Sequence, residues 1–217
     1  MNIESNIVLS KQAESALRFL EQTLRPSGAV WAVGGSTGLL LQGGSLAAQP
    51  RDLDIYADEA DAKAVHAALR HYAVDEQEHN ETPIYRSLLS HYEIEGVSVE
   101  LVGAFEVHAC ASQYVVETRL LLQRAAALAP ASGGNARSDS DGKLRLMPLV
   151  HELIFNVLRD RPDRYEIAAA LCRQTAREAH CRLLEELTAR NRFADPVRER
   201  LRALLGAEKE EEVPHEG

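Results

Sequence analysis

The most constraining feature of this sequence is the segment Val33–Asp58, VGGSTGLLLQGGSLAAQPRDLDIYAD, in which a glycine pair is followed by an apolar run and an Asp-Leu-Asp triplet. The triplet begins an alternation of charged and apolar residues, which is the period of a half-buried β-strand. Because successive strand side chains point to opposite faces, Asp52 and Asp54 share one face. Leu53 and Ile55 share the other. The pattern predicts a strand that buries its apolar face and presents two neighbouring carboxylates.

Two carboxylates side by side repel each other, and the pKa of one is raised unless a cation neutralises them. Mg²⁺ suits such a pair, because it prefers hard oxygen ligands and retains water and phosphate oxygens in its shell. The residues before the triplet predict a strand at 29–33, a turn through Gly34 and Gly35, and a short helix at 36–42. Backbone N–H groups at such a turn bind anions. The combination is typical of phosphoryl or nucleotidyl transfer.

A third carboxylate is predicted on a later strand. Residues 83–94 and 97–105 predict a β-hairpin joined at Glu95-Gly96. In its second strand the apolar side chains of Val97, Val99 and Leu101 fall on one face, and Glu100 falls on the other. Glu100 is therefore a candidate for holding a second metal ion or for accepting the proton of an acceptor hydroxyl. The alternative is a surface glutamate on an edge strand.

Composition narrows the class of protein. The chain has 217 residues and a net charge of −9, which argues against generic nucleic-acid binding, since that binding depends on Lys and Arg. No apolar run approaches the ~20 residues needed to span a bilayer, and no signal peptide is visible, so we expect no membrane association and a cytoplasmic location. The spacing of Cys110, Cys172 and Cys181 predicts neither a disulfide framework nor a zinc site.

The sequence predicts an α/β part followed by helices. A loop or linker is expected at 129–142, where small and polar residues dominate. It separates an α/β domain at 1–128 from a helical region at 143–206, and a charged tail at 207–217 is expected to be disordered. Helices are expected at 10–24 and 60–72, and then at 147–159, 162–177, 182–190 and 194–205.

The order of strand, glycine turn, short helix, Asp-x-Asp strand and later carboxylate resembles the DNA polymerase β-type nucleotidyltransferase superfamily. The likeness is strongest to small bacterial members, namely minimal, antibiotic-modifying and abortive-infection toxin-like nucleotidyltransferases. It covers residues 29–102, and a weaker likeness continues through LVHELIFNVLRDRPDRYEIAAAL. The resemblance implies an α+β fold with a mixed sheet and a C-terminal all-helical region. It also implies Mg²⁺-dependent transfer of a nucleoside monophosphate from a nucleoside triphosphate to a hydroxyl.

The resemblance assigns roles to individual residues. The third acid of the family is more often Asp than Glu, and Asn156 stands about where a basic residue is often found, so Arg161 or Arg164 would supply that charge. The implied nucleotide-binding residues are Gly34, Gly35, Ser36 and Arg51, and the implied catalytic and metal-binding residues are Asp52, Asp54 and Glu100.

The acceptor is not identified by the sequence, because fold does not fix function. A small molecule, a tRNA and a protein are all compatible with the family. One alternative is a catalytically silent copy of the fold that binds a nucleotide or a partner protein. A second is a toxin that modifies tRNA or protein. His108 and His151 lie in apolar surroundings and are expected to be structural.

Overall fold

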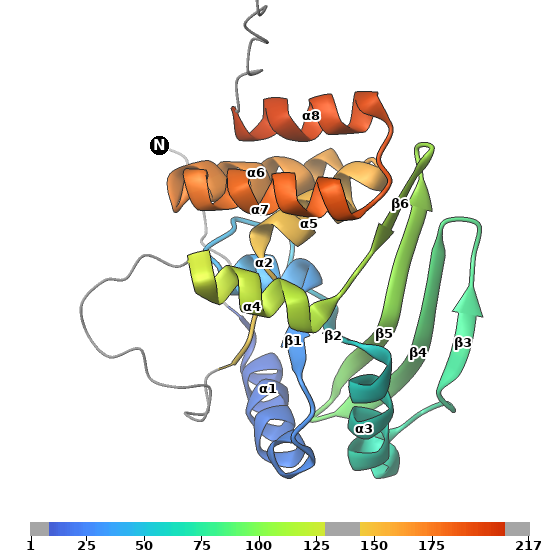
Figure 1. Ribbon diagram of the computed structural model, residues 1–217. Helices are drawn as coiled ribbons and strands as arrows, with labels where there is room; N and C mark the ends of the chain where they lie inside the picture. The colour runs from blue at the N-terminus through green and yellow to red at the C-terminus, as the bar shows by residue number, and fades with distance from the viewer. Residues whose placement is uncertain (1–8, 129–143, 207–217) are drawn as a thin grey trace, which may run out of the picture.

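A computed structural model describes residues 9–128 and 144–206 of the chain (Figure 1). The N-terminal half is mixed, and the elements described between residues 147 and 206 are all helices. The elements are α1 (Lys11–Leu24), the 3₁₀ turn η1 (Arg25–Ser27), β1 (Trp31–Val33), α2 (Gly35–Leu41), β2 (Asp52–Ala57), α3 (Glu59–Leu69), the 3₁₀ turn η2 (Arg70–Tyr72), β3 (Glu78–Glu81), β4 (Tyr85–Ile94), β5 (Val97–Ala109), β6 (Ser112–Val115), α4 (Thr118–Leu128), α5 (Leu149–Leu158), α6 (Pro162–Gln174), α7 (Arg177–Arg190) and α8 (Asp195–Leu205).

The strands form one mixed six-stranded sheet in the order β1-β2-β5-β4-β3, with β6 added to the far end of β5. Only the β2–β5 pair is parallel among these strands, and the other pairs are antiparallel. The β4–β5 hairpin turns at Glu95 and Gly96, both of which have positive φ, as a two-residue type I′ turn requires. Leu146 forms an isolated parallel bridge with Val33, the last residue of β1.

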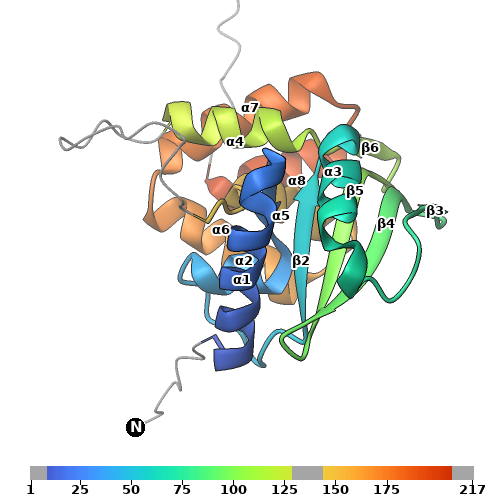
Figure 2. The ribbon, with the colours of Figure 1, turned by 90° about the horizontal axis from the view of Figure 1, so that it is seen from below.

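One face of the sheet is covered by α1 and α3, which lie on its near side in Figure 2. Ser10 caps α1 by accepting a hydrogen bond from the amide of Ala13 at 3.1 Å. The apolar stripe of α1 packs with the apolar faces of β2 and β5, and these side chains form one continuous core. Leu53 and Ile55 of β2 are fully buried in it.

The other face is covered at one end by the C-terminal helices, and a β-bulge in β5 makes this possible. Up to Gly103, the odd-numbered residues of β5 face α1 and α3. Ala104 has a φ of +46°, and the pairing with β4 shifts opposite it. Phe105 and Val107 then lie on the opposite face, where they pack with α5. The helical region therefore shares a core with the sheet.

The predicted fold class is confirmed, with differences in detail. The strand at 52–57, the hairpin and the helical C-terminal region are present as predicted. Strands β3 and β6 and helix α4 were not predicted, and α7 begins five residues earlier than the predicted helix at 182–190. The predicted linker and tail lie outside the described residues.

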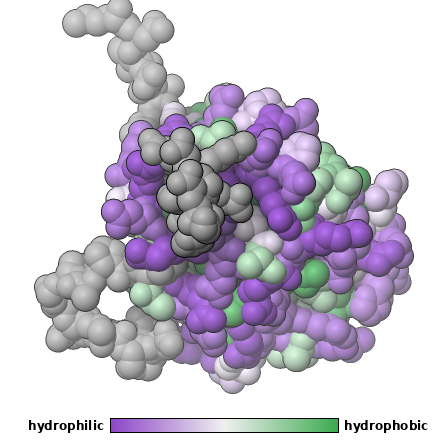
Figure 3. All heavy atoms as spheres, turned by 45° about the horizontal axis from the view of Figure 1, so that its top comes forward, coloured by the Kyte–Doolittle hydropathy of each residue, from purple (hydrophilic) through white to green (hydrophobic). Residues whose placement is uncertain are grey.

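The C-terminal helices present one face of the molecule to the viewer in Figure 3. Figure 3 shows this face as mainly hydrophilic, with hydrophobic residues in small separate areas. In the two described stretches of chain, no helix combines the length and apolar character needed to cross a bilayer.

Candidate active site

Three predicted carboxylates are neighbours on one face of the sheet. Asp52 and Asp54 lie on β2, and Asp54 is paired with Glu100 across the parallel β2–β5 ladder. Paired strand residues share a face, so all three carboxylates belong to the face that lacks α1 and α3. The alternation predicted for β2 and for the first half of β5 is confirmed by the burial of the intervening apolar residues.

Asp54 is the most strongly perturbed of the three. Its pKa is raised from 3.8 to about 7, mainly by burial and then by the charges of Asp52 and Glu100, and the charge of Arg159 opposes this rise. Burial also raises the pKa of Glu100; His91 counteracts this effect and Asp52 adds to it. Such a group binds a proton or a cation in preference to remaining a bare anion.

The glycine turn and Asp54 form a single unit. Gly35 has a φ of +60°, and a Cβ on it would lie 1.8 Å from Oδ2 of Asp54. A Cβ on Gly34 would lie 2.6 Å from the buried ring of Tyr56. A side chain at either position would clash with Asp54 or Tyr56, so both positions require glycine. Gly35 thereby lets the Asp54 carboxylate lie directly against the start of α2.

Glu152, which the sequence analysis did not single out, contacts the same turn. It lies on α5 and is fully buried, and its Oε1 accepts a hydrogen bond from the Gly35 amide at 2.7 Å. Burial raises its pKa to about 8, with the hydrogen bond from Gly35 opposing that rise and Asp54 adding to it. One signal was available, because Glu152 is the one acidic residue in the mainly apolar run LVHELIFNVL. Asn156 supports it by donating to its backbone carbonyl at 2.7 Å.

Arg159 is the cation that acts on this site. Its positive charge favours the ionised forms of Asp54 and Glu152. Its guanidinium lies 4.3 Å from the centre of the Phe155 ring, and its Nε donates to Asn156 at 3.1 Å. The resemblance had instead pointed to Arg161 or Arg164 for this charge. Both of them form ion pairs with Asp163, at 2.8 Å for Arg161 and 3.4 Å for Arg164.

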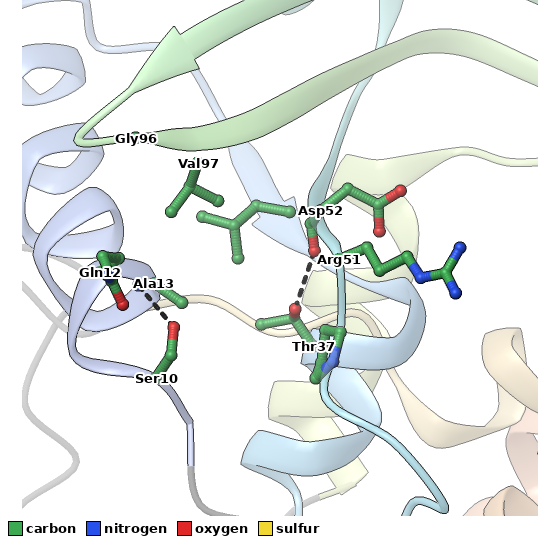
Figure 4. A pocket seen from close by; sticks show the side chains of 10 residues that line it. Ser10, Gln12, Ala13, Thr37, Arg51, Asp52, Gly96 and Val97 are labelled. Carbon is green, nitrogen blue, oxygen red and sulfur yellow. Dashed lines mark hydrogen bonds between the residues drawn. The ribbon is translucent and has the colours of Figure 1, made fainter.

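Arg51 directly precedes Asp52, and Ser36 directly follows Gly35. Figure 4 shows the side chains of Arg51 and Asp52 pointing away from Gln12 and Val97, which line a small depression on the other side of β2. The carboxylate therefore does not point into this depression. Ser36 lies in the first turn of α2, and the next residue, Thr37, donates from its hydroxyl to the carbonyl of Asp52 at 3.2 Å. This bond ties the start of α2 to the start of β2.

A histidine and a further acid border Glu100. Nε2 of His91 lies 3.5 Å from Oε2 of Glu100, and Nδ1 of His91 lies 2.5 Å from Oδ2 of Asp75. The predicted structural histidines lie elsewhere. His151 is buried against Tyr114, with 3.1 Å between its Nδ1 and the tyrosine hydroxyl.

The chemistry of the carboxylates fits Mg²⁺, although they do not by themselves form a closed metal site. Asp54 is a hard oxygen donor held between like charges, and a divalent cation would relieve their repulsion. Across residues 9–128 and 144–206, no three His, Cys, Asp or Glu side chains are already gathered around a common point in the way a metal ion requires. Phosphate oxygens and water would have to complete the coordination shell.

Comparison with known proteins shows only partial similarity. No family model matches the chain, and no curated protein matches it. Among solved structures it is similar to a candidate nucleotidyltransferase from Thermotoga maritima, with 22% identity and a TM-score of 0.44 over 48% of this chain. The match spans 63% of the Thermotoga protein, less than two thirds of its length. JHP933 from Helicobacter pylori is 12% identical with a TM-score of 0.25, and the match covers 92% of both chains. A candidate nucleotidyltransferase from H. pylori is 14% identical with a TM-score of 0.27, and the match covers 91% of this chain and 95% of that one.

Proposed function

We propose that this protein is a Mg²⁺-dependent nucleotidyltransferase that moves a nucleoside monophosphate from a nucleoside triphosphate to an acceptor hydroxyl. One observation carries the proposal: the Asp54 carboxylate lies against the Gly35 turn, with Asp52 and Glu100 beside it on the same sheet face. A triphosphate–metal complex needs this combination of carboxylate oxygens and closely approachable backbone.

Each residue of the site has a role in the proposed reaction. Asp52 and Asp54 would hold the metal ion, which supplies charge neutralisation and polarisation of the reacting phosphate when bound. Ser36 and the backbone of the turn would bind phosphate oxygens. Arg159 would balance part of the negative charge that a triphosphate brings to Asp54.

The proposed transfer is a direct displacement at the α-phosphorus. A bond forms between the acceptor oxygen and phosphorus, the bond to the bridging oxygen of the β-phosphate breaks, and pyrophosphate leaves. Glu100 is the candidate to take the proton of the acceptor hydroxyl, or to hold a second metal ion. The exposed fraction of its side chain is 38%, so an acceptor can reach it from solvent.

The test is a transfer assay with each α-labelled nucleoside triphosphate, Mg²⁺ and a cell extract as the pool of acceptors. We expect the parent protein to form a labelled product from an α-labelled but not from a γ-labelled nucleotide. Asp54→Asn should abolish labelling. Glu106→Gln is the matched control, because Glu106 lies on the same strand as Glu100 but pairs with His108 at 2.9 Å. No label transfer by the parent with any nucleotide would contradict the proposal.

One observation favours a second candidate, a fold that binds a nucleotide or a protein without catalysis. The Gly35 amide is already occupied by Glu152. A phosphate at this turn must use other donors or displace that carboxylate. Calorimetry and the label-transfer assay together separate the two candidates. A non-catalytic binding module would bind nucleoside triphosphate equally well with and without Mg²⁺, and it would transfer no label.

A further inference from the structure

We propose that His91, held by Asp75, is a positioning residue that fixes the Glu100 carboxylate in the candidate active site. The inference rests on the proposed function, since Glu100 needs a fixed orientation only if it serves a metal ion or an acceptor. His91 itself is not placed in contact with the nucleotide.

The sheet register places His91 beside Glu100. The two residues are direct partners in the antiparallel β4–β5 pair, so their side chains lie on the same face. Nε2 of His91 is 3.5 Å from Oε2 of Glu100. One oxygen of the carboxylate is thereby directed at the imidazole, and the second can face the aspartates of β2.

Asp75 fixes the imidazole from the other side. Its Oδ2 lies 2.5 Å from Nδ1 of His91, and its Oδ1 accepts the His91 backbone amide at 2.7 Å. An ionised carboxylate only accepts, so Nδ1 carries the proton of this bond and Nε2 is the atom left to face Glu100. Nε2 donates to the Glu100 carboxylate when the imidazole is the doubly protonated cation. The ring orientation is therefore determined by two bonds to one carboxylate.

The segment that carries Asp75 is itself attached to β4. Ala73 bridges Tyr92, and the amide of Val74 donates to the carbonyl of His91 at 2.9 Å. These backbone contacts hold Asp75 against the strand immediately after η2. Asp75, His91 and Glu100 therefore form a connected chain that begins on a fixed backbone and ends at the candidate site.

Stability alone does not account for this chain of three. The exposed fractions of the side chains are 43% for Asp75, 33% for His91 and 38% for Glu100. Ion pairs this exposed contribute little to folding. Hydrogen-bonded partners behind a metal-binding carboxylate, in contrast, set its orientation, and their loss weakens metal binding about 10- to 100-fold.

The experiment measures metal binding instead of turnover. Mn²⁺ replaces Mg²⁺, free Mn²⁺ is counted by electron paramagnetic resonance, and a non-hydrolysable nucleoside triphosphate analogue is present throughout. His91→Leu removes both ring contacts, and Asp75→Asn removes the acceptor for Nδ1–H while leaving Oδ1 for the backbone amide. His91→Gln retains an amide donor that can reach Glu100. His108→Leu is the matched control, because it breaks a comparable His–Glu pair away from the site.

We expect Mn²⁺ affinity to fall about tenfold or more in His91→Leu and in Asp75→Asn, to recover in His91→Gln, and to stay unchanged in His108→Leu. In the parent, the ring nitrogen resonances of His91 should shift when Mg²⁺ is added, and those of His108 should not. Asp75→Asn alone decides the matter if His91→Leu does not fold. Parent-like Mn²⁺ affinity in Asp75→Asn and His91→Leu, with a parent that binds the ion, would overturn this inference but leave the proposed function. A parent that binds no Mn²⁺ would overturn both.

Discussion

Asp54→Asn should make the metal-free protein more stable at pH 8. Asp54 holds its proton up to about pH 7 in the folded protein, against an ordinary pKa of 3.8. Between these values the folded state binds more protons than the unfolded chain. The contribution of Asp54 to stability is therefore complete below about pH 4 and is lost as the pH rises through 7. Asparagine carries no charge and removes this loss.

The magnitude follows from the pKa. A tenfold change in proton affinity corresponds to about 1.4 kcal/mol, so the full change for Asp54 would be roughly 4 kcal/mol. Asp54 is half-buried and not fully buried, so solvent screening reduces this figure and we expect about 2 kcal/mol. For a chain of this size that corresponds to roughly 4–8 °C in melting temperature.

Thermal melts at pH 5 and pH 8, with and without Mg²⁺ and a triphosphate, measure the pH dependence of stability and the stabilisation by ligand. Without metal, the parent should lose more stability than Asp54→Asn between pH 5 and pH 8. With ligand at about 100 times its Kd, the parent should gain roughly 2.7 kcal/mol, and the variant should gain little. Glu106→Gln should follow the parent. A lower metal-free melting temperature in Asp54→Asn at pH 8, together with an undiminished ligand-induced shift, would refute the metal-site interpretation.

Three further predictions concern the surroundings of Asp54. Gly35→Ala places a methyl group against the Asp54 carboxylate at a positive φ, so it should cost about 1–2 kcal/mol by denaturant unfolding and weaken triphosphate binding by calorimetry. Unchanged triphosphate binding in Gly35→Ala would show that the Asp54 side chain can move away from the added methyl group, and it would contradict this prediction. Arg159→Gln removes a charge that lowers the pKa of Asp54, so the loss of metal-free stability should shift to higher pH in a series of melts; an unchanged midpoint would count against Arg159. Generic duplex and single strands should bind no tighter than micromolar at physiological salt, given the net charge of −9, which fluorescence anisotropy would check. Submicromolar binding would contradict this expectation.

The sequence was sufficient where a local pattern carried the information. The alternation in residues 52–57 and 97–102 predicted which side chains share a face, and the structure confirms it. Strand β3, Glu78–Glu81, was missed because all four residues are exposed on an edge strand and show no apolar period. Helix α4 was also missed, but its sequence did carry a signal, because strong helix formers fill Thr118–Leu128.

The surroundings of Asp54 could not be derived in the same way. Glu152 lies 117 residues from Gly35 in sequence, and its hydrogen bond to the turn exists only because α5 packs against α2. Arg159 was passed over in favour of its neighbours because a helical pattern does not show which arginine reaches the sheet. Whether Ser36 and Arg51 bind nucleotide stays a prediction.

The bulge at Ala104 determines which side chains of β5 lie beneath the C-terminal helices, next to the candidate active site. Along β5, the face shared with Asp54 is polar as far as Glu100, and from Val102 onward it is the apolar floor beneath the C-terminal helices. The phase change at Ala104 adds Phe105 and Val107 to that floor, where an uninterrupted strand would have placed Glu106. The polar surface already ends between Glu100 and Val102, and the one extra backbone residue at Ala104 keeps the floor beyond that point apolar. A homologous strand without the bulge would place a charged residue at the position of Glu106 beneath the helices, with the carboxylates of the site unchanged.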